Sequence, residues 1–193
     1  MLRAICIATA DLGAPADHLY DDPALLHRVY LDPYLEFEPD LAFVASDAEG
    51  PAGYAVGTAD TDGFHARWSE EWSPRFAAIH PDPPQVVTSD DGLARLLHHP
   101  GHGVPAGLAP EYPAHLHIDL LARARGQGVG RQALQLLLAA LAAAGAGGVF
   151  LGVDPRNSVA VAFYDSLGFV PVTVDRVWMA RKLPSAPEPI RRP

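Results

Sequence analysis

A glycine-rich turn in the second half of the chain has residue types that suit an anionic ligand. It reads Arg125-Gly126-Gln127-Gly128-Val129-Gly130 and falls between an expected strand and an expected helix. Glycines there let the backbone approach a ligand closely, and the free N–H groups at the helix start suit a pyrophosphate. The turn lacks the Gly-Lys-Ser/Thr of a P-loop and the G-x-G-x-x-G of a dinucleotide fold. Taken alone, it is equally well explained as an ordinary structural turn.

A second pattern follows one strand later and supplies a tyrosine. It is Asn157-x-x-Ala160-x-x-Phe163-Tyr164-x-x-x-Gly168-Phe169. Asn157 has a structural explanation as a helix N-cap, and the two phenylalanines have one as core residues. Because Tyr164 directly follows Phe163, we expect it on a different side of the helix from that core residue. At the edge of a cleft the Tyr164 hydroxyl would be able to donate a proton, whereas in a core it would only be satisfied.

Three polar residues alternate along the strand that precedes the glycine-rich turn. His115, His117 and Asp119 are two residues apart, so they share one face of that strand. The opposite face is expected to belong to the core and consists of Leu116, Ile118 and Leu120. Asp119 is our first choice as general base and His117 is its rival, since an unperturbed Asp titrates at about 3.9 and an imidazole at about 6.5. The alternatives are a solvated strand face and a His-x-His-x-Asp metal site.

Aromatic and histidine side chains are concentrated in the proline-rich segment 59–113. We interpret this segment as a helical insertion that forms a substrate lid, because a connection of this length is seldom plain loop. The side chains that could line a substrate groove, together with His115, are Trp68, Trp72, Tyr112, His98, His99 and His102. Each of them is also explained by packing or by surface exposure. His98-His99-x-x-His102 resembles a loose metal cluster without a supporting helix or strand, and we predict no metal site.

The elements that must position these residues alternate between strands and helices. The predicted strands are 2–9, 40–46, 54–58, 115–121, 149–153 and a closing hairpin of 169–174 with 177–183. The predicted helices are 23–31, 64–79 with an interruption at Pro74, 90–99 capped by Ser89, 129–143 and 157–167. This order predicts an α/β fold with a mixed central sheet of about six to seven strands, flanked by helices, with the insertion before the fourth strand. We expect a single domain over 1–183 and a disordered tail over 184–193.

Composition narrows the classes of partner. The chain has 193 residues, of which 14 are Lys or Arg and 23 are Asp or Glu, and its formal net charge is −9. This balance disfavours a nucleic-acid surface or an anionic membrane and is weakly compatible with a cationic acceptor. The single Cys6 excludes a disulfide framework and a cysteine-based zinc site, so we expect a reducing, cytoplasmic setting. The apolar run 4–8 is too short for a signal peptide, and no stretch approaches the roughly 20 apolar residues of a membrane span.

The glycine-rich turn and the Asn157–Phe169 pattern together resemble the GNAT superfamily of acetyl-CoA-dependent N-acetyltransferases. The pair R-x-x-G-x-G and N-x-x-A-x-x-F-Y-x-x-x-G-F stands at the separation typical of that family, and the match covers about 114–183. A narrower resemblance comes from Glu38-Pro39-Asp40-Leu41-Ala42-Phe43-Val44-Ala45 and Gly53-Tyr54-Ala55-Val56-Gly57-Thr58. These segments look like the C-terminal acetyltransferase-like domain of the animal O-GlcNAc hydrolase. That domain lacks a proper pyrophosphate turn, whereas this chain has one, so it resembles a free-standing bacterial relative that keeps the acetyl-CoA site.

The resemblance implies a GNAT fold and a role for each matched position. The backbone around Leu120 and Leu121 would pair with the pantetheine arm, and the amides of Arg125, Gly126, Gln127, Gly128, Val129, Gly130 and Arg131 would hold the pyrophosphate. Asn157 and Tyr164 would face acetyl-CoA near its sulfur, with Tyr164 protonating the departing thiolate. A primary amine, on a small molecule or a protein lysine, would attack the thioester directly, and the protein would be a monomer or homodimer. The alternative is a pseudo-acetyltransferase that uses the fold only for recognition or for binding acetyl-CoA.

Overall fold

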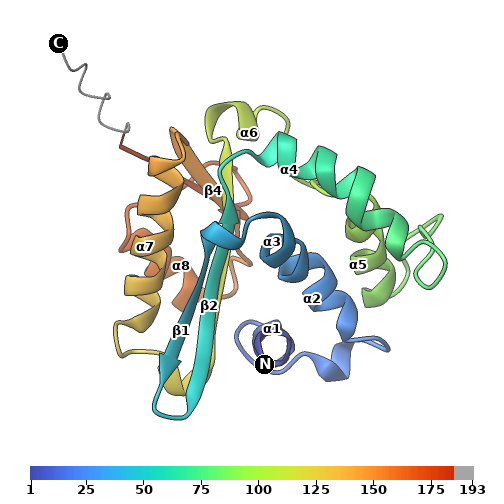
Figure 1. Cartoon of the computed structure of the whole chain (residues 1–193), viewed down its shortest axis with the longest axis horizontal. Coiled ribbons are helices and arrows are strands. Elements are labelled where there is room, and N and C mark those ends of the chain that lie inside the picture. Colours follow the sequence, from blue (N-terminus) through green and yellow to red (C-terminus); the bar gives the residue numbers. More distant parts are fainter. Residues whose placement is uncertain (185–193) are drawn as a thin grey trace.

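A mixed sheet forms the centre of the computed structural model, which describes residues 1–184. Within those residues the sheet has six strands in the order β1-β2-β3-β4-β6-β5 (Figure 1). Their bounds are β1 Ala42–Asp47, β2 Gly50–Thr58, β3 Ala114–Leu120, β4 Gly148–Gly152, β5 Val170–Pro171 and β6 Trp178–Lys182. The predicted mixed α/β sheet is therefore confirmed, with hairpins β1–β2 and β5–β6 at its two edges. Apart from Pro184, the tail predicted over 184–193 lies outside the described residues.

One face of the sheet is covered by two helices that the sequence predicts well. Helix α7 spans Val129–Ala143 and α8 spans Ser158–Asp165 (Figure 1). Apolar side chains at helical spacing along α7 are fully buried against the strands, including Leu134, Leu137 and Leu141. Helix α7 then ends where the chain turns at Gly145, whose φ is +95°.

The other face of the sheet is covered by the N-terminal helices. These are α1 Leu2–Thr9, α2 Ala24–Tyr30 and α3 Asp32–Phe37, with single 3-10 turns at Asp17–Leu19 and Pro39–Leu41. The strand predicted over 2–9 is wrong. Its content of isoleucine suggests a strand, but its buried residues Ile5, Cys6 and Thr9 have the spacing of a helix face. Helix α3, with Pro33 in its first turn, has no counterpart among the predicted elements.

The predicted insertion is helical, and it precedes the third strand of the sheet instead of the fourth, because 2–9 is not a strand. Helix α4 spans Thr61–Arg67 and continues through a π-helical turn Trp68–Trp72 and a 3-10 turn Ser73–Arg75 that contains Pro74. Helix α5 spans Ser89–His98 and α6 spans Leu108–Glu111. The cap of α5 is Thr88, not Ser89. Its hydroxyl accepts from the Asp91 amide, while the Asp91 carboxylate accepts from the Thr88 amide.

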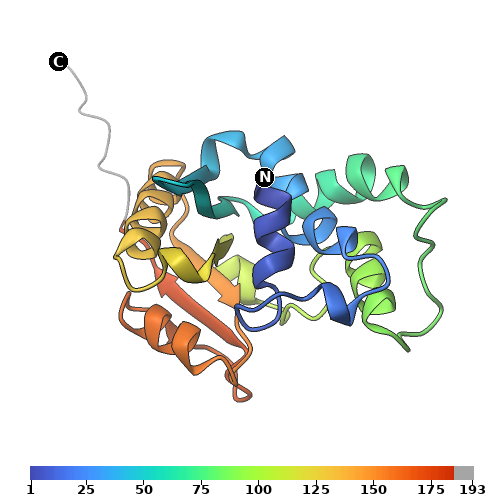
Figure 2. The ribbon, with the colours of Figure 1, turned by 90° about the horizontal axis from the view of Figure 1, so that it is seen from below.

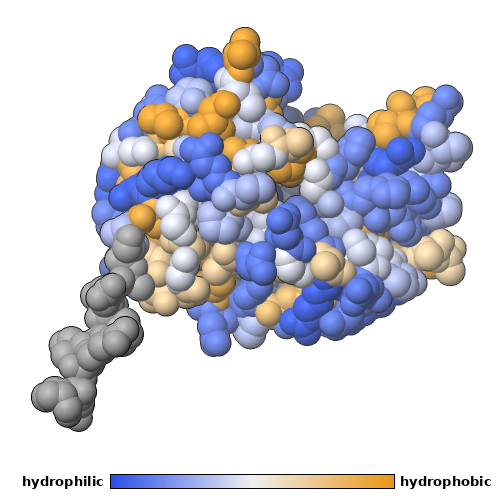
Figure 3. All heavy atoms as spheres, turned by 90° about the horizontal axis from the view of Figure 1, so that it is seen from above, coloured by the Kyte–Doolittle hydropathy of each residue, from blue (hydrophilic) through white to orange (hydrophobic). Residues whose placement is uncertain are grey.

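The helices divide into two groups on either side of β3 and β4. Figure 2 shows α1, in dark blue, between the half that holds α7 and α8 and the remaining N-terminal and insertion helices. The face in Figure 3 is mostly hydrophilic, with smaller apolar areas between polar residues. In the described part of the chain, no helix combines the length and apolarity that crossing a bilayer would take.

Candidate active site

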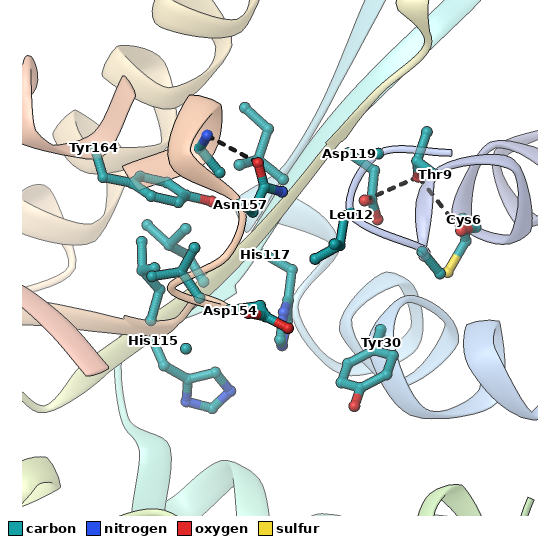
Figure 4. Close-up of a pocket in the computed structure, with 18 of the residues that line it drawn as sticks. Cys6, Thr9, Leu12, Tyr30, His115, His117, Asp119, Asp154, Asn157 and Tyr164 are labelled. Carbon is teal, nitrogen blue, oxygen red and sulfur yellow. Dashed lines mark hydrogen bonds between the residues drawn. The ribbon is translucent and has the colours of Figure 1, made fainter. Parts of the chain in front are cut away.

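A cleft opens where two neighbouring strands of the sheet separate. In the described chain, β3 pairs with β4 only at Ala114–Val149 and His115–Phe150, and beyond these pairs the two strands diverge. The cleft has a volume of about 1080 Å³ and lies between α1 and α2 on one side and α7 and α8 on the other. Residues of both predicted patterns and of the polar face of β3 line it (Figure 4).

The edge of β3 that borders this gap has backbone groups without a strand partner. On its other edge β3 pairs with β2 in an unbroken antiparallel register, and the Leu121 amide donates to the Ala52 carbonyl at 2.8 Å. Because backbone groups alternate between the two edges of a strand, those of Ile118 and Leu120, beyond the last β3–β4 pair, face the gap. The structure therefore leaves Leu120 at the gap, but the amide proposed for ligand pairing at Leu121 is already used by β2.

The glycine-rich turn ends this edge and begins α7. Gly126 and Gly128 have φ of +74° and +80°, a conformation that favours glycine. Among the described residues no side chain caps α7, so the amides of its first turn, from Val129 to Arg131, keep their hydrogens free toward the cleft end. Gly130 serves packing, since a Cβ there would run into Leu120.

The polar side chains of this turn bond within the protein. Arg125 donates to the Leu120 carbonyl at 2.8 Å and to the Gly13 carbonyl at 2.5 Å, which joins the N-terminal segment to the end of β3. Gln127 donates to the Arg123 carbonyl, and Arg131 donates to the Ser166 hydroxyl. The turn thus offers a ligand its backbone amides and two adjacent positive charges, at Arg125 and Arg131.

Helix α8 contributes Asn157 and Tyr164 to the same side of the cleft as α7. Asn157 is the N-cap, as its structural explanation had it, because its Oδ1 accepts from the Ala160 amide at 3.1 Å. Tyr164 lies at the cleft, but the expected division between a core Phe163 and a cleft-facing Tyr164 is not seen. Tyr164 is buried, with 8% of its surface exposed, while Phe163 is half-buried, and both line the cleft. Burial raises the pKa of Tyr164, with a smaller contribution from the charge of Asp119, so its hydroxyl keeps its proton at neutral pH.

Asp119 lies on the cleft wall with a hydrogen bond to each carboxylate oxygen. Thr9, from α1, donates to Oδ1 at 3.0 Å, and Tyr54, from β2, donates to Oδ2 (Figure 4 shows the Thr9 bond). Tyr54 stands directly opposite Asp119 in the β2–β3 register, which explains its reach. Burial raises the pKa of Asp119, although the bonds from Tyr54 and Thr9 and the charge of Arg125 oppose that rise. A carboxylate with a raised pKa accepts a proton more readily than an ordinary aspartate.

The two histidines of the polar face of β3 are joined through a tyrosine. His115 Nε2 and His117 Nε2 lie 2.7 Å and 3.1 Å from the Tyr34 hydroxyl, and His115 Nδ1 lies 2.8 Å from the Thr61 hydroxyl. Burial lowers the pKa of His117 to about 4 and that of His115 well below its ordinary value, with like charges at His65 and His117 adding to the latter. His115 is buried, and His117 and Asp119 are half-buried and line the cleft, so this face is not the fully solvated strand face of the alternative explanation.

Of the six insertion residues proposed to line a substrate groove, the structure brings Trp68 and His102 to the cleft. Trp68 lines it, with its indole N–H donating to the Leu97 carbonyl at 2.9 Å. Trp72 lies outside and donates to the Arg28 carbonyl, and Tyr112 lies outside beneath Lys182. His102 lines the cleft, whereas His98 and His99 bond to the His80 carbonyl and to Asp82. No cluster of three or more potential metal ligands occurs among the described residues.

Several residues of the site carry no recognisable signal in the sequence. They are Thr9, Tyr30, Tyr34, Tyr54 and Thr61. Of these, Tyr54 alone could have been found, by aligning β2 against β3 so that it falls opposite Asp119. Cys6 also lines the cleft, and burial, followed by the charge of Asp119, raises the pKa of its thiol to about 12. The thiol is therefore protonated and a poor nucleophile at neutral pH.

Comparison with known proteins gives consistent matches. Residues 12–169 match the model of the Acetyltransferase (GNAT) family. The chain is 37% identical to SsHAT, whose crystal structure has a TM-score of 0.87 over 94% of this chain and 91% of that one. A solved acetyltransferase of 21% identity shares the fold, with a TM-score of 0.56 over 94% of each chain. Protein O-GlcNAcase of Rattus norvegicus is 24% identical over 161 residues, which are 78% of this chain and 18% of that protein. The chain thus spans less than a fifth of the length of this curated relative.

Proposed function

The chain belongs to the GNAT acetyltransferase family, and on that premise we propose that it transfers an acetyl group from acetyl-CoA to a primary amine. The observation that carries the proposal is the content of one cleft. A strand edge with free backbone groups and a helix start with free amides lie at one end of it, and a buried carboxylate faces it from β3.

The residues of the gap fit acetyl-CoA. The edge of β3 offers the backbone groups of Ile118 and the Leu120 amide to the amides of a pantetheine arm, while the Leu120 carbonyl already accepts from Arg125. The start of α7, with Gly126 and Gly128 and the charges of Arg125 and Arg131, offers amides and positive charge to a pyrophosphate. When bound there, acetyl-CoA would supply an acetyl group activated as a thioester.

Asp119 would act as the general base. An amine acceptor is mostly protonated in water, since an unperturbed lysine has a pKa of about 10.4, so a proton must be removed before attack. The raised pKa of Asp119 and its place on the cleft wall suit it to take that proton. Burial lowers the pKa of His117 to about 4, which makes it a weaker base than an ordinary imidazole, and we therefore propose Asp119 in preference to it.

The remaining groups would act on the charges that develop during transfer. A backbone N–H of β3 at Ile118 or Leu120 would donate to the carbonyl oxygen as it gains negative charge. The Tyr164 hydroxyl, which keeps its proton because its pKa is raised, would donate that proton to the departing sulfur. The acceptor would approach from the side of α1 and α2, where the polar face of β3 is presented.

Two measurements test the proposal in sequence. Titration with acetyl-CoA should raise the unfolding temperature. At an acetyl-CoA concentration of 100 times the dissociation constant, binding should add about 2.7 kcal/mol to the free energy of unfolding. A screen of amines that reads the release of free thiol should then find an acceptor. Absence of stabilisation would contradict the acetyl-CoA site. Stabilisation without thiol release from any amine would instead indicate a binding module.

A further inference from the structure

Four polar side chains form a row of hydrogen bonds that runs from the cleft wall into the protein interior, and the proposed acetyl transfer does not use it. It runs from the Thr61 hydroxyl through His115 and the Tyr34 hydroxyl to His117 Nε2. Thr61 has 2% and Tyr34 has 3% of its surface exposed, so water has little access to these two hydroxyl groups. Its two histidines remain uncharged at neutral pH because burial lowers the pKa of each.

The direction of the hydrogen bonds in this row follows from where protons can go. A neutral imidazole has one N–H and one bare nitrogen, so each histidine must donate on one side and accept on the other. In the described part of the chain, the hydroxyl proton of Thr61 has no acceptor other than His115 Nδ1. A buried hydroxyl proton left without an acceptor is costly, so Thr61 donates to Nδ1.

The rest of the order is then fixed. With Nδ1 accepting, His115 carries its proton on Nε2 and donates to the Tyr34 oxygen, at 2.7 Å. The single Tyr34 proton is thereby left for His117 Nε2, at 3.1 Å. His117, accepting at Nε2, must carry its own proton on Nδ1. Within the described residues, His117 Nδ1 has no hydrogen-bond partner. It is also not one of the buried atoms that lack a partner, and His117 lines the cleft, so Nδ1 is accessible from the cleft.

We propose that His117 presents its Nδ1–H to the cleft as a hydrogen-bond donor, held in this tautomer by Thr61, His115 and Tyr34, and that it recognises a neutral oxygen on the acceptor amine. His117 contacts the acceptor, and the other three are positioning residues. Recognition of the acceptor by His117 rests on the proposed acetyltransferase function. The tautomer of His117 does not depend on that function.

The charges around the cleft select a neutral oxygen. Among the described residues that line it, the Lys and Arg side chains are Arg125 and Arg131, both at the α7 end, while Asp119 and Asp154 are anionic. A carboxylate on the acceptor would meet no cation beside His117. A hydroxyl or an amide carbonyl needs only a neutral N–H donor.

The spacing along β3 limits the size of the acceptor. Residues two apart on one face of a strand are about 7 Å apart, so Asp119 and His117 can contact the two ends of a short molecule. Figure 4 shows His117 below Asp119 and the α8 residues Asn157 and Tyr164, with Asp154 beside it in this view. An amine at Asp119 with an oxygen three bonds from its nitrogen fits this arrangement. The class is that of small amino alcohols and of α-amines followed by an amide.

The tautomer is measured directly by NMR on 15N-histidine-labelled protein at neutral pH. We expect the His117 proton on Nδ1 in the unsubstituted protein. Tyr34→Phe or Thr61→Val should move part of that population to Nε2. Thr58→Val is the matched control. Thr58 is a buried threonine of β2 whose hydroxyl donates to Glu38 and not to any of the four hydrogen-bonded side chains. A proton on Nε2 in the unsubstituted protein would overturn the proposal, whatever the variants do.

Recognition of the acceptor oxygen is tested by adding 2-aminoethanol or propylamine. Propylamine has a methyl group in place of the hydroxyl group of 2-aminoethanol. The His117 Nδ1–H signal should shift with 2-aminoethanol and not with propylamine, and 2-aminoethanol should bind about 3- to 10-fold more tightly. His117→Leu should abolish the preference, and His117→Gln, which retains an N–H, should restore part of it. Equal affinity of both amines for the unsubstituted protein would overturn the proposal. Because this readout is binding, its failure is distinct from an absence of acetyl transfer, which would contradict the proposed function.

Discussion

The two sides of the cleft are built in different ways. The side formed by the edge of β3, the start of α7 and the start of α8 consists mainly of backbone groups and comes from one continuous stretch, 116–164. The side formed by the polar face of β3 consists of side chains, whose partners Thr9, Tyr34 and Tyr54 come from α1, α3 and β2. Thr9 and Asp119 are 110 positions apart in the chain.

This difference determines how each side can be disrupted. A backbone site depends on the conformation of a few positions and tolerates changes of side chain that keep that conformation. A site of buried polar side chains depends on every partner, because each group left unpaired is penalised. Substitutions can therefore test one side at a time.

The largest effect is expected from Gly128→Asp on the backbone side. It puts a side chain at a φ of +80° and a negative charge beside the proposed pyrophosphate site. Acetyl-CoA should no longer stabilise the variant in a thermal-shift titration.

Gly145→Asp provides the matched control for that loss. Gly145 has a φ of +95° at the far end of α7, and a Cβ added there would have no described atom within 4 Å, as is also true of Gly128. Both variants carry the strain of a positive φ, and the Gly145 variant adds a negative charge near the C-terminus of α7, but that variant should still respond to acetyl-CoA. Equal responses from both would place the pyrophosphate elsewhere.

Asp119→Asn should give the next largest effect, from the side-chain side. It keeps the shape but removes the charge and the basicity, and loss of a general base lowers the rate by about 10²–10⁴-fold. In the parent, the rate should fall on acidification as Asp119 is protonated, starting at a higher pH than for an ordinary aspartate because its pKa is raised. The variant should bind acetyl-CoA normally and lack this acid limb. A parental rate with a parental limb would exclude Asp119 as the base.

Tyr164→Phe should lower kcat by about 10²-fold. The ring stays, so the packing of this buried residue against Phe169 is retained, and only the proton donor is lost. Affinity for acetyl-CoA should be nearly unchanged, which binding measurements would establish alongside turnover. An unaltered kcat would mean that water protonates the departing thiolate.

The smallest effect is expected from Thr9→Val, which removes one of the two hydrogen bonds to the Asp119 carboxylate. These bonds favour the charged form, so the pKa of Asp119 should rise further and the acid limb should move up by about one pH unit. Thr58→Val, at a buried threonine that does not contact Asp119, should leave the limb in place. An unmoved limb in the Thr9 variant would show that α1 does not act on the base.

The same contrast explains how far the sequence could predict the site. The backbone side follows from local patterns: the helix of α7 has its predicted bounds, and Asn157 caps α8. The hydrogen-bonding direction of Leu121 escapes prediction because it depends on the β2–β3 register, which no local pattern contains. The burial of Tyr164 escapes prediction because the packing of α8 decides which of two adjacent aromatic residues is buried more deeply.

The side-chain side could be predicted only in part. Alternation along β3 correctly places His115, His117 and Asp119 on one face. What covers that face escapes prediction, because the composition of 2–9 favours a strand. A short segment rich in isoleucine is compatible with both the helical and the strand period. In the structure β1 forms the edge of the sheet, and 2–9 adds no strand to it. No pattern in the sequence therefore predicts that Thr9 lies beside Asp119.

The burial of Cys6 makes the protein its own reporter of local opening. The sole thiol of the chain is protonated, and Cys6 exposes 1% of its surface at the cleft wall, so its reaction with an alkylating reagent reports the separation of α1 from β3. The labelling rate then gives the free energy of that separation, a local unfolding event, without any substitution. Because Arg125 joins the segment after α1 to the glycine-rich turn, a ligand that orders this turn would slow the labelling of a residue on the opposite side of the cleft.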